Sequence, residues 1–185
     1  MTKHNAAFSQ PYYSRHPIVH LRRGEVKPFL KAYYNTVASL PDRETYTFWE
    51  HYYHASAHKT HEEGWFLMQT RWMLWMEQGD TLKLLSGVPR SYLEDGKNIE
   101  IENASSYFGK FSLRVDSELN RGRIRAAVEC ATDRAPRRVA LRLPHPLGRR
   151  ATAVQGGKYD SATETVLLEP FSGRAEVTLN FDSGE

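Results

Sequence analysis

Carboxylates, histidines and aromatic rings gather in one stretch of this 185-residue chain, between residues 44 and 79. The stretch holds all four tryptophans and four of the eight histidines. Within it, Glu50 stands between Trp49 and His51, and Glu62 follows after a short loop-like segment. Aromatic surroundings desolvate a carboxylate, which suits acid–base chemistry, and flat rings also offer a surface on which a sugar can stack. Glu50 is therefore the first catalytic candidate, and Glu62 is the second.

Other side chains of the same stretch are suited to contact a sugar through rings or hydrogen bonds. We expect these substrate-binding residues to be Trp49, His51, Tyr53, His54, His61 and Trp65. The four histidines, at positions 51, 54, 58 and 61, also allow a metal site, but they do not form the H-E-x-x-H pattern of zinc proteases. We therefore predict no metal ligands and no cofactor, and keep a small histidine-cluster metalloprotein as an open alternative.

Residues 61–78 follow the pattern of a helix with a defined start and end. Thr60 and Glu63 have the spacing of a capping box, and Gly79 can take the positive φ that often ends a helix. Apolar side chains occur around the whole circumference, which is typical of a helix buried on all sides. Such a helix requires neighbours beyond the few other helices that the sequence predicts.

The composition excludes several classes of partner. A formal charge of +3 is too small to indicate nucleic-acid binding, and no run of about 20 apolar residues predicts a membrane span. The N-terminus lacks the apolar core of a signal peptide, which leaves the localisation open: cytoplasmic as the sequence stands, or periplasmic or secreted if the natural N-terminus lies elsewhere. Cys130, the single cysteine, lies in an alternating run and is expected to be buried.

The remaining sequence divides into a helical part and a strand-rich part. Helical spacing predicts helices over residues 16–23 and 25–40. After Gly79, glycine and proline punctuate short alternating runs, which is typical of antiparallel strands in a β-sandwich. The predicted strands are residues 82–85, 99–103, 111–119, 123–130, 139–143, 151–154, 165–169 and 175–181. The expected fold is α+β, with a helical domain over residues 1–80 and an antiparallel β-sandwich over residues 81–185.

Three pairs of segments resemble the C-terminal part of six-hairpin glycosidases, the (α/α)6-barrel enzymes that include rhamnosidase-like and glucoamylase-like members. The first pair resembles the Trp-Glu element and last barrel helix, the second resembles the passage from barrel to sandwich, and the third resembles late sandwich strands. These pairs are residues 47–50 with 64–75, residues 84–101 with 105–109, and residues 142–146 with 153–157.

The resemblance implies a glycoside hydrolase of the inverting type, in which one carboxylic acid protonates the leaving oxygen and one carboxylate activates water. The matching position for the water-activating base is Glu50. The general acid would lie on an earlier hairpin, outside this sequence, so the isolated chain is expected to be inactive. The helical part would then be the last hairpins of the barrel. Its expected partners are a carbohydrate and either the missing part of the barrel or a second copy that covers the apolar helix.

A non-catalytic interpretation stays open beside the enzymatic one. The β-sandwich with a helical attachment could be a carbohydrate-binding or interaction module, whose affinity for sugar would not depend on Glu50. The sequence itself specifies neither the sugar nor the linkage.

Overall fold

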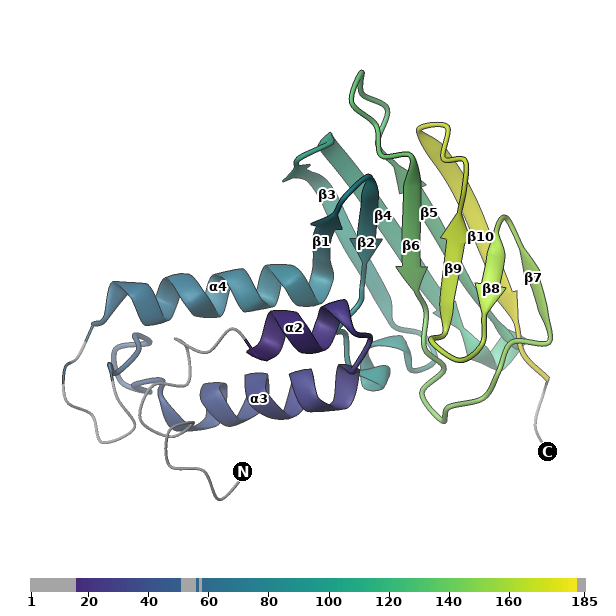
Figure 1. Cartoon of the computed structure of the whole chain (residues 1–185). Coiled ribbons are helices and arrows are strands. Elements are labelled where there is room, and N and C mark those ends of the chain that lie inside the picture. The colour runs from purple at the N-terminus through teal and green to yellow at the C-terminus, as the bar shows by residue number, and fades with distance from the viewer. Residues whose placement is uncertain (1–15, 51–55, 57, 183–185) are drawn as a thin grey trace. The chain divides into compact units, whose positions relative to one another are not determined.

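The computed structural model describes residues 16–50, 56 and 58–182. The chain separates into two compact units, one ending at Leu74 and one starting at Trp75, and each is described by itself. Within the described residues, the first unit contains three α-helices and the second contains two five-stranded sheets (Figure 1). The predicted α+β class is confirmed, while the predicted barrel origin of the helices stays a prediction.

Helix α2 spans His16–Arg22, α3 spans Val26–Ser39 and α4 spans Thr60–Leu74. The turn between the first two depends on Gly24, whose φ of 74° lies in the left-handed region that favours glycine. Nδ1 of His20 lies 2.5 Å from a carboxylate oxygen of Glu25 across this turn. The bounds of α2 and α3 agree with the sequence prediction to within a residue.

The core of the helical unit is aromatic. The rings of Tyr33 on α3 and Phe66 on α4 stack with centroids 5.9 Å apart, and Phe48 contacts Phe66 at 5.0 Å. The hydroxyls of Tyr33 and Thr70 lie 2.9 Å apart, so the phenol has a polar partner despite its burial. Ring packing with a satisfied hydroxyl fixes the face of α4 that is turned towards α3.

The prediction that α4 is buried on all sides is wrong. Leu67 is 66% exposed and Met68 is 42% exposed, whereas the buried positions of α4 are Glu62, Gln69 and Met73. The physical reason is that the helical unit contains too few described elements to cover every face of this helix. Two polar side chains consequently lie inside while two large apolar side chains face outward.

The predicted C-terminal end of this helix is also wrong. The helix ends at Leu74, and Trp75–Gln78 forms strand β1, which pairs antiparallel with β2 (Thr81–Leu84). Gly79 does have a positive φ, of 60°, but it occupies the first central position of the β1–β2 hairpin, as in a type II′ turn. The pairing with β2 therefore replaces the last helical turn.

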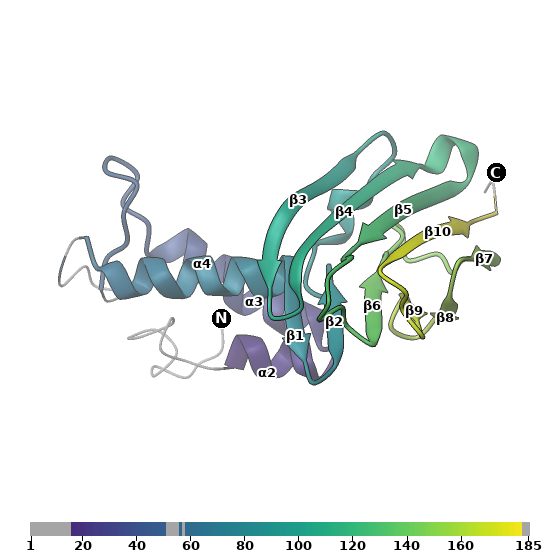
Figure 2. The ribbon, with the colours of Figure 1, turned by 90° about the horizontal axis from the view of Figure 1, so that it is seen from above.

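The second unit consists of two sheets that face each other (Figure 2). One sheet has the strand order β1-β2-β6-β9-β8 and the other has the order β3-β4-β5-β10-β7. Neighbouring strands are antiparallel except for β2 and β6, which are parallel. The further strands are β3 (Asn98–Ser106), β4 (Gly109–Glu118), β5 (Arg123–Glu129), β6 (Arg138–Arg142), β7 (Ala153–Gln155), β8 (Lys158–Asp160), β9 (Thr165–Leu168) and β10 (Arg174–Asn180).

Along the central strands, buried apolar side chains alternate with more exposed ones, and the buried ones form the core between the sheets. Each large aliphatic side chain that is fully buried stabilises the fold by about 1.5–3 kcal/mol. Cys130 is fully buried, as predicted, and burial raises the pKa of its thiol. Core side chains that are at most 1% exposed include Leu82, Leu84, Phe111, Leu113, Val115, Ile124, Val128, Val139, Leu141, Val166, Val177 and Leu179.

Within the part of the chain that the structure describes, no helix has both the length and the hydropathy needed to cross a membrane.

Candidate active site

The loop that carries Glu50 is held by backbone hydrogen bonds on both sides. The amide of Trp49 donates to the carbonyl of Leu40 at 3.0 Å, and the amide of Lys59 donates to the carbonyl of Phe48 at 3.0 Å. The amide of Glu50 itself donates to the carbonyl of Ser56 at 2.9 Å. These bonds bring the Trp-Glu element next to the first turn of α4.

The carboxylate of Glu50 forms an ion pair with Nζ of Lys59 at 3.1 Å. The two side chains are 24% and 31% exposed, so the pair is partly sheltered from solvent screening. The carbonyl of Lys59 accepts the amides of Glu62 and Glu63, so Lys59 is the residue that immediately precedes α4 and accepts its first hydrogen bonds. The predicted cap residue, Thr60, is instead the first residue of the helix.

Glu62 lies in the first turn of α4 and is only 1% exposed. Its Oε2 is 3.4 Å from Nδ1 of His61, too far for a good hydrogen bond, and has no hydrogen-bond partner among the described residues. The N-terminus of a helix carries partial positive charge, which favours an anion at this position. The structure therefore brings the two predicted carboxylates, together with His61, to the same end of α4.

The predicted aromatic and histidine substrate-binding residues do not form one group in the described structure. Trp49 is half-buried beside Glu50 in the sequence, whereas Trp65 packs on the Leu40–Phe48 cluster and meets the ring of Trp72 edge-on, with centroids 6.1 Å apart. His51, Tyr53 and His54 lie outside the described residues.

Sequence reasoning missed two residues of this region. Lys59 was missed because only the folded loop brings its ammonium group to Glu50. Gln69 is 1% exposed, and neither atom of its amide group has a hydrogen-bond partner among the described residues. Gln69 is followed by the polar Thr70 and Arg71, so residue type alone gave no signal that this side chain is the buried one.

A metal centre is not found in the part of the chain that the structure describes, where no three His, Cys, Asp or Glu side chains are grouped to hold an ion. Since His51 and His54 lie outside that part, the histidine-cluster alternative stays a prediction.

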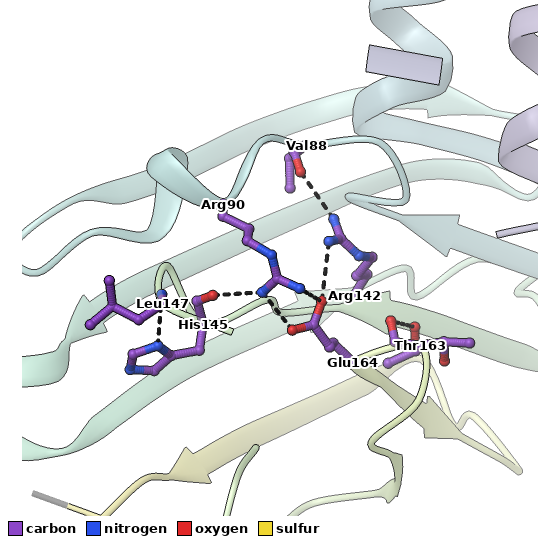
Figure 3. Close-up of polar contacts among 8 residues, drawn as sticks. Val88, Arg90, Arg142, His145, Leu147, Thr163 and Glu164 are labelled. Atoms are coloured by element: carbon purple, nitrogen blue, oxygen red, sulfur yellow. Dashed lines mark hydrogen bonds and ion pairs between the residues drawn. The ribbon is translucent and has the colours of Figure 1, made fainter. Parts of the chain in front are cut away.

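A second polar cluster lies in the sandwich unit (Figure 3). The guanidinium of Arg90 donates to both carboxylate oxygens of Glu164, at 2.6 and 2.8 Å, and also to the carbonyl of His145 at 2.6 Å. Arg142 donates to the carbonyl of Val88 at 3.0 Å and to Glu164 at 3.3 Å. These contacts join three chain segments that are distant in sequence, so we interpret the cluster as structural.

His145 belongs to the same cluster and is 6% exposed. Its Nδ1 accepts the amide of Leu147 at 3.0 Å, which places the proton of the neutral ring on Nε2. Burial, followed by the charges of Arg149 and Arg90, lowers the pKa of this imidazole. The ring centroid lies 4.8 Å from that of Phe181.

Neither a known protein family nor a curated protein sequence matches this chain.

Proposed function

We propose that this chain is the base-carrying part of an inverting glycoside hydrolase. The proposal rests on the sequence resemblance to six-hairpin glycosidases and on one structural observation, the sheltered ion pair between Glu50 and Lys59 at the start of α4. In an inverting mechanism the base acts as a carboxylate, and Lys59 is a countercharge that suits an anion at this position.

In the proposed reaction the Glu50 carboxylate takes a proton from the water that attacks the anomeric carbon. A general acid, carried by barrel hairpins outside this sequence, protonates the leaving oxygen as the glycosidic bond breaks. Glu62 is the second candidate for the base, because it lies in the first turn of α4, next to the loop that carries Glu50. Trp49 is the candidate stacking surface beside the base.

The test uses the chain joined with, or co-expressed with, a polypeptide that carries the remaining barrel hairpins, assayed on a panel of aryl glycosides. Glu50→Gln should lower turnover by about 10²–10⁴-fold and leave the affinity for sugar unchanged. Glu44→Gln changes an exposed carboxylate of the same loop and should leave turnover unchanged. Unchanged turnover in the Glu50 variant would overturn the assignment of the base.

The chain by itself provides a second test. It should not hydrolyse any of the aryl glycosides, because the proposed general acid lies on another segment. Robust hydrolysis by the isolated chain would contradict a base-only role and would direct attention to Glu62 as an acid.

A non-catalytic sugar-binding role is the alternative, and one observation favours it: the sandwich unit has a groove of its own, remote in sequence from Glu50. Sugar binding that is identical in the parent chain and in the Glu50→Gln variant, with no hydrolysis by the assembled enzyme, would support this alternative.

A further inference from the structure

A groove of about 530 Å³ lies in the sandwich unit beside the turn that passes from one sheet to the other. Its walls are Gly156 and Gly157, the start of β8, the end of β9, the segment 169–172 and the start of β10. This volume falls within the range of about 300–1,000 Å³ that small-molecule sites usually have.

Two glycines form one wall of the groove with their backbone. A Cβ atom on Gly156 would lie 1.8 Å from the carbonyl oxygen of Glu176, and a Cβ on Gly157 would lie 2.5 Å from Cγ1 of Val166. The turn therefore lies directly against β10 and β9, one strand from each sheet. No larger residue fits there without displacing a strand.

The strand edge beside this turn is incompletely paired. Strand β7 pairs with β10 only at Thr178–Asn180, whereas β5 pairs with β10 from Arg174 to Asn180. Gly156 lies directly against the carbonyl of Glu176, so among the described residues the part of this edge without a neighbouring strand or turn is Arg174 and Ala175, the two residues of β10 that line the groove. The backbone of these two residues offers polar groups to a ligand with hydroxyl groups.

The charges around the groove are mainly positive. Lys158 and Arg174 line it and are exposed, and no ion pair of Lys158 is found in the described part of the chain. Arg174 lies 3.8 Å from a carboxylate oxygen of Glu176, but both side chains are more than 70% exposed, so this pair is weak. The carboxylate that lines the groove, Glu169, lies 3.9 Å from Arg138.

We propose that this groove binds an anionic sugar, a mono- or disaccharide that carries a carboxylate. Lys158 and Arg174 supply the charge that a carboxylate requires. The backbone of β10 at Arg174 and Ala175 and the hydroxyl of Ser172 suit the ring hydroxyls. The side chains of Leu167 and Pro170 provide apolar surface for a ring face. The groove belongs to the sandwich unit, whereas Glu50 belongs to the helical unit, and the proposal does not depend on the proposed hydrolysis.

Titration of the ¹⁵N-labelled chain with D-glucuronate tests the proposal, with D-glucose and inorganic phosphate as matched probes. We expect saturable amide shifts at the groove residues with a Kd of about 1 mM, weakened by added salt, and no comparable shifts with glucose. Absence of saturable shifts with glucuronate would overturn the proposal. Equal shifts with phosphate alone would contradict the proposed sugar ligand and would show that the groove binds anions in general.

A pair of double variants separates the groove from the rest of the surface. Lys158→Gln with Arg174→Gln should weaken glucuronate binding at least about tenfold, the effect of losing about 1.4 kcal/mol. Lys97→Gln with Arg121→Gln removes the same charge from exposed positions outside the groove and should bind as the parent does. Equal binding by both double variants would contradict the assignment, and well-dispersed spectra of each variant show that it is folded.

Discussion

Glu164 and Arg142 form an ion pair at 3.3 Å with about nine-tenths of each side chain buried. Burial lowers the pKa of the Arg142 guanidinium, and the Glu164 carboxylate opposes that effect. A buried ion pair adds little net stability, because burying both charges is costly. Removing only one of the two side chains is nevertheless expected to destabilise the fold strongly, because the remaining charge stays buried without its partner. Arg90 forms a second ion pair with the Glu164 carboxylate, at 2.6 Å (Figure 3).

Glu164→Gln is expected to lower the free energy of unfolding of the sandwich unit by about 3 kcal/mol, since it leaves the buried Arg142 charge without its counterion. Asp116→Asn removes a comparable contact, the 3.1 Å pair with Arg114, but that arginine is 60% exposed. The control should cost less than about 1 kcal/mol. Urea unfolding followed by circular dichroism compares the two variants. Equal losses in the free energy of unfolding would show that the buried Glu164 pair is no more important for stability than the exposed Asp116 pair.

His145 is expected to make stability depend on pH. Its lowered pKa means that, below the ordinary value of 6.5, the unfolded chain binds a proton that the folded chain does not. Stability should therefore fall as the pH is lowered from about 7 to about 5.5, by up to 1.4 kcal/mol per pH unit for this one group. Above about pH 7 the imidazole is neutral in both states and contributes no pH dependence.

The comparison of the parent chain with His145→Gln isolates this contribution from the other titrating groups. Calorimetric unfolding of both proteins across that pH range should give a steeper loss of stability for the parent. Parallel curves would show that the ring is protonated equally easily in the folded and unfolded states.

Strands β4 and β5 were predictable because apolar and polar residues alternate along each of them, so that one face of the strand is buried and the other is solvated. The strand at Trp75–Gln78 was not, since its apolar residues continue the helical pattern of α4. Gly79 could not resolve the ambiguity, because a helix end and a type II′ turn both require a positive φ there. The decisive factor is the pairing of β1 with β2, a tertiary contact.

The candidate site, like the strands, was predictable only in part. Glu50 and Glu62 were identified from residue type and neighbours, and the fold places both near the first turn of α4. The ammonium group of Lys59 and the inward position of Gln69 were not identified, because both depend on the loop path and on which face of α4 is covered.

Gly156→Ala is expected to destabilise the sandwich unit by more than about 3 kcal/mol, because its new Cβ would overlap the carbonyl of Glu176. Gly96 is a matched control, with a positive φ of 77° but no heavy atom within 4 Å of the place that a Cβ would take. Gly96→Ala should cost only the backbone strain, about 1–2 kcal/mol. Thermal unfolding of both variants separates steric overlap from strain, and similar losses would argue against close packing of the turn.

Gln69→Met is expected to stabilise the helical unit by about 1–2 kcal/mol. The substitution keeps the size of the side chain and removes a buried amide that has no hydrogen-bond partner among the described residues, so it relieves a desolvation penalty. Lys31→Met replaces an exposed polar side chain on α3 of the same unit and should change stability by less than about 0.5 kcal/mol. Because Trp49, Trp65 and Trp72 lie in the helical unit, tryptophan fluorescence during urea unfolding reports mainly on this unit. A loss of stability in Gln69→Met would mean that the amide is satisfied in solution, by water or by another part of the chain, and that its burial supports the fold.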